Sequence, residues 1–537
     1  MVLWKHLTGL EYPDSLQFCY FNMDNNKVTN SLKAIFKGGV ITLFGTAAGY
    51  LLNFVFKVIA ARHFGPEQYG RFSLALAVVV IASSISGMGM FQSVARFIPF
   101  FRKRNEPEKI FYTVNFGVKL SLITSLIIGC LLLVNSGWIS KQLNGERDFK
   151  TFIMFFVLVV PFEVIFDFSL GVLRGMKDMK MMALFNNIIL WVVRLLLLGL
   201  IIMTGWDVKC MVLPYLASYL VASSLSWTYI IKRHSIPGRA LYSSGSSDPS
   251  LRKELLTFSL PLVFSTITTM FRKRFDVILV GFFLTATQAG LYYAALPLAM
   301  LMTIFLFSIN RIAMPIASGL FGEESEKEMA YVYKAIARWS LMVTLPLFFV
   351  LFLYPERLIS IFFGKEFLEA SNALRILSVG FFFNAISGSF GDYLQSYNRT
   401  KSILVISVIG TSLNLALMVA LIPKFGIEGA AIALAGSLAY MCLLGVLYMH
   451  HYKKVLPFSK EYFLTLVIGT FIYAGSYFVF YLFPLEPSMT GHLVFAGVIA
   501  TMSVIYFAIL FFGATDDFDR RILSSIRKRS GQLLQRT

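Results

Sequence analysis

Long apolar runs alternate with short polar connections along almost the whole chain. Fourteen of these runs have the 17–25 residues, roughly, that an α-helix needs to cross a bilayer. They lie at residues 39–61, 72–95, 110–134, 150–172, 184–204, 211–231, 256–283, 291–318, 335–355, 371–392, 402–422, 428–449, 463–484 and 492–513. The pattern predicts an all-α polytopic membrane protein with about fourteen transmembrane helices.

The basic residues predict how these helices are oriented. Of the 48 Lys and Arg residues, 31 fall in the connections and tails on one side, 9 on the other side and 8 within apolar runs. Because positive residues stay on the cytoplasmic side, we expect a multi-pass protein of the cytoplasmic (inner) membrane with both termini in the cytoplasm. The net charge of +19 therefore reflects topology and does not indicate a nucleic-acid partner.

The two parts of the chain also resemble each other. Gly70 pairs with Gly290 at an offset of 220, and Lys180 with Lys401 and Gly205 with Gly426 at an offset of 221. Six helices per half give a parallel repeat, as in many alternating-access transporters. We therefore expect a cytoplasmic segment at 1–38, an N-lobe at 39–231, a cytoplasmic linker at 232–254, a C-lobe at 255–449, two further helices within 450–513 and a basic cytoplasmic tail at 514–537. The sequence leaves open whether translation starts at Met1 or Met23.

Several motifs occur in a fixed order along the chain. They are Ala60-Ala-Arg-His-Phe-Gly-Pro-Glu-Gln-Tyr-Gly70, Phe258-Ser-Leu-Pro261 and Leu421-Ile-Pro-Lys-Phe-Gly-Ile-Glu-Gly429. Over residues 31–529 the chain resembles the polysaccharide transporter family, the Wzx-like O-antigen and lipid-linked oligosaccharide flippases of the MOP flippase superfamily. The resemblance implies a MATE/MOP-like fold with two pseudo-symmetric six-helix lobes around a central cavity. It also implies export of undecaprenyl- or dolichyl-linked sugars.

One apolar segment contains an unusual cluster of charges. Arg272, Lys273, Arg274 and Asp276 lie within the run 256–283, where each charge costs roughly 2.5–3.5 kcal/mol at a helix centre. The repeat places this cluster inside the membrane, level with Lys57 of the other half. Since arginine binds phosphate oxygens in a bidentate manner, we expect Lys57, Arg272 and Arg274 to bind a phosphate headgroup.

The acidic residues within the apolar runs leave two interpretations open. Asp276 is four residues from Arg272, so it is either the counter-ion of that arginine or a site for a coupling ion. Glu163 and Asp167 share one helix face and have Arg194 as a potential partner on the next predicted helix. These three residues form either a structural ion pair or a Na⁺ or H⁺ coupling site. No other cofactor or metal is expected.

The sequence favours a transporter over an enzyme. It has no Walker A loop, no H-E-x-x-H and no G-x-S-x-G motif. We expect a flippase that moves polyprenyl-(di)phosphate-linked oligosaccharide across the membrane by alternating access, for surface polysaccharide or glycan biosynthesis. Its expected partners are this substrate, membrane lipids and glycan-assembly machinery. The alternatives are a cation-coupled multidrug-type exporter of the same fold and a membrane glycosyltransferase or polymerase.

Overall fold

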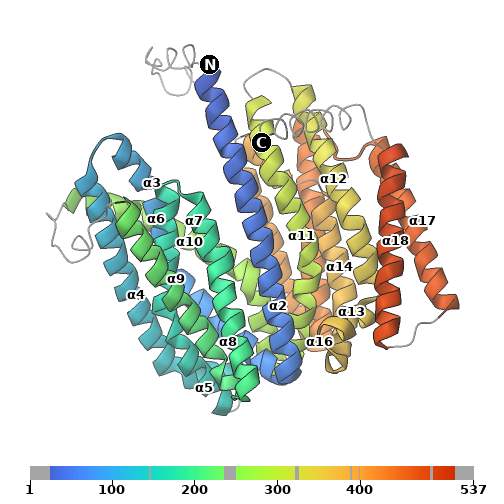
Figure 1. The fold of residues 1–537 in the computed structure, drawn as a ribbon, viewed down its shortest axis with the longest axis horizontal. Helices are drawn as coiled ribbons and strands as arrows, with labels where there is room; N and C mark the ends of the chain where they lie inside the picture. The colour runs from blue at the N-terminus through green and yellow to red at the C-terminus, as the bar shows by residue number, and fades with distance from the viewer. Residues whose placement is uncertain are drawn as a thin grey trace, which may run out of the picture.

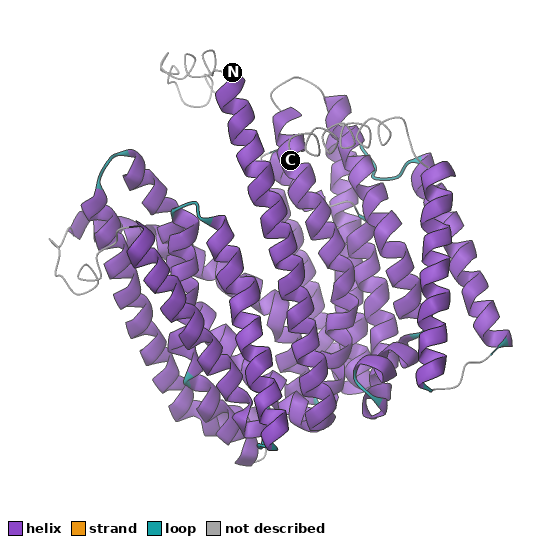
Figure 2. Ribbon diagram, viewed as in Figure 1, coloured by secondary structure: helices purple, strands orange, loops and turns teal. Residues whose placement is uncertain are grey.

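Every secondary-structure element in the described part of the protein is a helix, as Figure 2 shows. The computed structural model describes residues 25–143, 147–234, 249–320, 326–387, 390–397, 399–483 and 488–513. The first half contains α2 (Asn25–Ser86), α3 (Met90–Lys103), α4 (Pro107–Gln142), α5 (Arg147–Val157), α6 (Val159–Gly175), α7 (Met179–Leu184), the π-helical turn η2 (Phe185–Ile189), α8 (Leu190–Thr204), η3 (Val208–Met211) and α9 (Val212–His234).

The second half is built in a similar way and ends with two further helices. It contains α10 (Pro249–Phe283), α11 (Ala286–Leu320), α12 (Glu326–Leu353), α13 (Pro355–Phe362), η5 (Lys365–Ala370), α14 (Ser371–Ile386), α15 (Phe390–Ser396), α16 (Thr400–Lys453), α17 (Lys460–Leu482) and α18 (Met489–Gly513). The prediction of an all-α membrane protein is confirmed. The two candidate start residues, most of the linker and the basic tail lie outside the described residues.

Each of the fourteen predicted runs falls on helix, but the number of membrane crossings stays a prediction. Within the described residues, eight helical stretches are long and apolar enough to span a bilayer, or nine if the pair α5 and α6, bent by 40°, is one span. Two of these stretches each contain two predicted runs. Their arms meet at Gly65 (φ 73°) in α2 and at Gly426 (φ 58°) in α16. Positive φ angles suit glycine, and they interrupt the helical backbone at both places.

The helices form two groups with α2 between them. In Figure 1, α3 to α9 lie on one side and α11 to α18 on the other. Helix α2 packs against α11 and also against α6 and α8, while α10 packs against α2, α3 and α16. We call the face where α2 begins the inner face, and the face that holds the Gly65 and Gly426 breaks the outer face. The positive-inside pattern predicts that the inner face is cytoplasmic.

The glycines paired by the sequence repeat contact each other in space. A Cβ added to Gly70 would collide with the carbonyl of Ala286, and a Cβ added to Gly290 would collide with the carbonyl of Pro66. The contact is therefore reciprocal, as expected where two halves meet near a pseudo-two-fold axis. The paired Gly205 and Gly426 also share a backbone state, with φ of 67° and 58°. The residue boundaries of the lobes and linker stay predictions.

Candidate functional site

A cavity of about 690 Å³ opens among the helices of the first half. Its lining comes from α2, from the helices α6 to α9 with η2, and from one residue of α11. The lining residues are Thr46, Gly49, Tyr50, Asn53, Lys57, Leu76, Val80, Glu163, Arg174, Met179, Met182, Ala183, Asn186, Asn187, Leu190, Trp191, Arg194, Tyr215, Tyr219 and Tyr293. Among the side chains that the structure describes, the lining thus comes mainly from the predicted N-lobe, and α11 contributes that of Tyr293.

The wall formed by α2 is a polar stripe at helical spacing. Thr46, Tyr50, Asn53 and Lys57 are three or four residues apart, so they project from one face of the helix. Gly49 lies in the same stripe, and a Cβ there would come within 2.8 Å of the Cβ of Asn187. The missing side chain allows α2 to pack directly against η2, whose two asparagines then face the polar stripe across the cavity.

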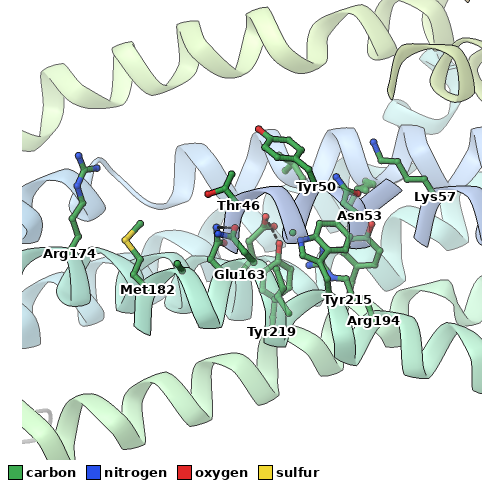
Figure 3. Close-up of a pocket in the computed structure, with 18 of the residues that line it drawn as sticks. Thr46, Tyr50, Asn53, Lys57, Glu163, Arg174, Met182, Arg194, Tyr215 and Tyr219 are labelled. Atoms are coloured by element: carbon green, nitrogen blue, oxygen red, sulfur yellow. Dashed lines mark hydrogen bonds between the residues drawn. The ribbon is translucent and has the colours of Figure 1, made fainter. Parts of the chain in front are cut away.

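Lys57 lies where the cavity meets the second half of the protein. Its Nζ atom lies 4.8 Å from the centre of the Tyr293 ring on α11, and its side chain is half-buried. The neighbouring Phe56 is buried and packs edge-on against Trp191 and Tyr215, which fixes the rotation of α2. In Figure 3, Lys57 and Arg174 lie toward opposite ends of the lining, with Glu163 between them. The cavity therefore has a cation toward each end.

Arg194 is buried in an aromatic cage. The Cζ atom of its guanidinium lies 4.0 Å from the ring centre of Tyr215, 4.6 Å from that of Trp191 and 4.8 Å from that of Tyr219. Its Nε atom donates a hydrogen bond of 3.0 Å to Ser218 Oγ. A planar, weakly hydrated guanidinium suits such stacking, and the cage holds the charge in place.

Glu163 is buried beside this cage and is held by two hydroxyl groups. Ser83 Oγ donates to Glu163 Oε2 over 2.7 Å, and Tyr219 Oη donates to Glu163 Oε1 over 2.9 Å. Tyr219 thus touches both Glu163 and Arg194. The structure brings these two predicted residues together through a shared tyrosine, which the sequence did not indicate.

Asp167 lies one helical turn after Glu163 and is exposed. Glu163 and Arg174 both line the cavity from α6, and Asp167 lies between them on the same helix face. Asp167 itself is not among the residues that line the cavity, so its predicted place in a coupling site stays a prediction. Among the described residues, no group of three or more His, Cys, Asp or Glu side chains is placed to hold a metal ion.

The predicted cation cluster lies on α10. The side chains of Arg272 and Arg274 are outside the described part of the structure, so their expected role stays a prediction. Asp276 is buried at the contact with α11, accepts a hydrogen bond of 3.3 Å from Tyr292 Oη and is not among the cavity-lining residues. The geometry therefore associates Asp276 with the packing of α10 on α11.

Several cavity residues were missed by the sequence reasoning. They include Tyr50, Asn53, Arg174, Asn186, Asn187, Trp191, Tyr215, Tyr219 and Tyr293. The three asparagines, Asn53, Asn186 and Asn187, could have been singled out from the sequence, because polar side chains within apolar runs are as unusual as charged ones. For the aromatic residues no signal existed, since the chain has 24 tyrosines and most of them have no distinctive spacing.

Comparison with known families identifies the protein's class. Residues 35–321, more than half of the chain, match the family described as "Polysaccharide biosynthesis protein". The chain belongs to this family. A second family, MatE, matches residues 261–420, which agrees with membership of the MOP flippase superfamily.

Individual relatives cover most of the protein. The "Probable low-salt glycan biosynthesis flippase Agl15" of Haloferax volcanii is 25% identical over 82% of this chain and 88% of its own length. The "Putative O-antigen transporter" of Shigella flexneri is 23% identical over 74% of this chain and 94% of its own length. The solved structure "Lipid II flippase MurJ, inward closed conformation" shares the fold with a TM-score of 0.70 at 16% identity, over 88% of this chain and 99% of that one. This family member is a flippase or transporter of polysaccharide or glycan biosynthesis.

Proposed function

We propose that the protein moves a polyprenyl-(di)phosphate-linked oligosaccharide from the inner to the outer leaflet of the cytoplasmic membrane by alternating access. The observation that carries this proposal is the mixed lining of the cavity, which combines cations, neutral amides and aromatic rings. A glycan headgroup with its phosphate is too polar to cross hydrocarbon without compensating hydrogen bonds and charges. The cavity offers such groups, and its volume accommodates several sugar rings or part of a longer glycan.

The two ends of the cavity suit different parts of such a substrate. Lys57 provides a cation for phosphate near the second half, together with the predicted contribution of Arg272 and Arg274. Asn53, Asn186 and the other neutral groups offer donors and acceptors to sugar hydroxyls. Caged Arg194 has its charge already engaged by three rings and Ser218, so we assign it to structure and to the local positive potential.

The outer face supports the alternating-access part of the proposal. Tyr293, whose ring contacts Lys57, follows Gly290 by three residues in α11. Gly290 in turn contacts Gly70 of the other half. Phe54 also packs against Phe362 at 5.2 Å between ring centres. These contacts join the two halves at the outer face, and we infer that they close it. Separating the two halves at these contacts would open the cavity toward the outer face. Because Lys57 both lines the cavity and contacts Tyr293, a bound substrate can affect whether these contacts stay formed.

Two carboxylates give the proposal a candidate coupling site. Glu163 is fixed by two hydroxyls, and Asp167 is exposed one turn away. We propose that this pair takes up Na⁺ or H⁺, with Arg194 as its structural neighbour. The same carboxylates favour the second candidate function, a cation-coupled exporter of small organic cations, because acidic groups in a cavity attract such substrates.

The two functions are separated by measuring lipid-linked glycan at the outer leaflet of cells that depend on this protein. Lys57→Ala is expected to lower surface glycan at normal protein levels, while Lys141→Ala, an exposed lysine at the end of α4, serves as the matched control. A multidrug-type exporter predicts the opposite pattern: unchanged surface glycan in both variants and loss of resistance to organic cations in Glu163→Gln.

A further inference from the structure

A second cluster of cations and tyrosines lies outside the cavity lining, at the inner end of α16. Because α16 reverses direction at Gly426, its first and last residues return to the same face. Arg399 precedes the helix and Lys453 ends it, so residues 54 positions apart come together. The apolar span of α16 is bounded by Lys401 and Lys453, which places the cluster at the level of the lipid headgroups.

Arg399 and Lys453 lie over the same aromatic ring. The guanidinium Cζ is 4.4 Å and the lysine Nζ is 5.1 Å from the centre of the Tyr452 ring, and Nζ is 4.8 Å from that of Tyr397. The two charges are thus within about 10 Å, a distance over which salt screens like-charge repulsion only in part. Arg399 is exposed, so an anion from the surroundings can reach it.

Neighbouring tyrosines complete one wall of the cluster. The rings of Tyr448 and Tyr452 stack with centres 6.1 Å apart, and Tyr397 meets Tyr452 edge-on at 6.0 Å. Tyr448 Oη accepts a hydrogen bond of 2.7 Å from Ser402 Oγ, which fixes the oxygen while its own O–H stays a donor. An interfacial aromatic belt explains tyrosines at this depth, but it does not explain why two cations converge on one of them.

The sequence repeat supplies an internal comparison for this position. At the offset of 221, Arg399 corresponds to Asp178, and both residues immediately precede a helix. Asp178 accepts hydrogen bonds from Met181 N at 3.2 Å and from Tyr229 Oη at 2.7 Å. The first half therefore carries its own anion at a position where the second half has a guanidinium.

We propose that the cluster of Arg399, Lys453, Tyr448 and Tyr452 binds the phosphate of an anionic membrane phospholipid at the inner face. The phosphate supplies at this position of the second half the negative charge that Asp178 supplies in the first half. Arg399 and Lys453 contact its oxygens, and the tyrosine hydroxyls face the glycerol and headgroup. This site lies on the second half and is independent of the glycan cavity, so neither proposal depends on the other.

Native mass spectrometry of the purified full-length protein tests the site. Incubated with equal amounts of phosphatidylglycerol and phosphatidylcholine, the wild type is expected to retain phosphatidylglycerol preferentially. Arg399→Gln should lower that retention about fivefold, which corresponds to one basic residue at an anionic surface. The matched control is Arg104→Gln, since Arg104 is likewise an exposed arginine at a helix end and lies 4.2 Å from an aromatic ring centre, that of Phe100. Equal losses in the two variants would overturn the proposal, because they would reflect general attraction to basic surface.

Two further arms identify the source of the phosphate. Inorganic phosphate at millimolar concentration should not displace the phospholipid; displacement would assign the site to a soluble anion and overturn the lipid assignment. Polyprenyl phosphate should compete no better than phosphatidylglycerol; stronger competition would assign the site to the carrier lipid and would also overturn it. Arg399→Lys keeps the charge and should restore most of the retention. Thermal unfolding in lipid-free detergent should shift equally in Arg399→Gln and Arg104→Gln, because each variant loses one cation–π contact.

Discussion

Adding one methyl group to the glycine contact at the outer face should open that face. In Gly70→Ala the new Cβ collides with the backbone carbonyl of Ala286, and in Gly290→Ala it collides with that of Pro66. Backbone atoms cannot rotate away as a side chain can, so α2 and α11 must separate by on the order of 1 Å. Overpacking of this kind costs about 1–3 kcal/mol. A penalty confined to the closed state shifts the closed–open equilibrium about 5- to 150-fold toward the open state.

Distances between spin labels measure this shift directly. The labels are placed at His63→Cys in α2 and Lys365→Cys in η5, two exposed positions at the outer face, one in each half, in a cysteine-free background. In Gly70→Ala or Gly290→Ala, the distance between the labels should include a longer population. The control is Gly199→Ala in α8, where an added Cβ meets nothing within 4 Å. If both glycine variants keep the original distance distribution and fold normally, the contact does not control closure and the reasoning fails.

Three further predictions concern the cavity and its support. Glu163→Gln keeps the shape of the side chain and one hydrogen-bond acceptor but removes the charge. Transport should therefore lose its dependence on a Na⁺ or pH gradient, while the melting temperature changes little. If transport in proteoliposomes keeps the same dependence on the gradient, Glu163 has a structural role only. Arg194→Lys should lower stability by about 1–2 kcal/mol, because an ammonium cannot stack on three rings as a guanidinium does, and thermal unfolding in detergent should show the loss. Gly49→Val should separate α2 from η2 and reduce substrate binding, whereas Gly475→Val, which meets no neighbour within 4 Å, should not; equal effects would contradict the close approach at Gly49.

Hydrophobic periodicity was sufficient to predict the helical segments and the membrane class. It could not predict how they are interrupted. The predicted run 150–172 is two helices bent by 40° around Leu158. Pro161 is the local signal for this break, because it has no N–H to bond the carbonyl of Val157, but the hydrophobic pattern alone does not show it. The repeat was more informative than its weak sequence identity suggests, because Gly70 and Gly290 prove to be in contact with each other.

The candidate site was only partly predictable. Lys57, Glu163 and Arg194 could be found because charges are rare in apolar runs, and the structure places all three along one cavity. The residues around them could not be predicted. The direction in which each side chain points depends on how its helix is rotated and where it crosses its neighbours, which the sequence does not show. The cage around Arg194 is made by aromatic residues from two helices. The expected role of Arg272 and Arg274 stays a prediction, because their side chains lie outside the described part of the structure.

The proposed function requires this cavity to carry the headgroup of a lipid-linked glycan. Proteoliposomes containing the purified protein and a defined polyprenyl-diphosphate-linked oligosaccharide test it most directly, with the glycan exposed on each leaflet quantified by a membrane-impermeant glycosidase. We expect rapid transfer between leaflets by the wild type and by Lys141→Ala. Lys57→Ala should be at least roughly tenfold slower, because it loses a charge-assisted contact worth on the order of 1.5–3 kcal/mol. Transfer by Lys57→Ala at the wild-type rate, or no transfer by the folded wild type, would contradict the proposed function.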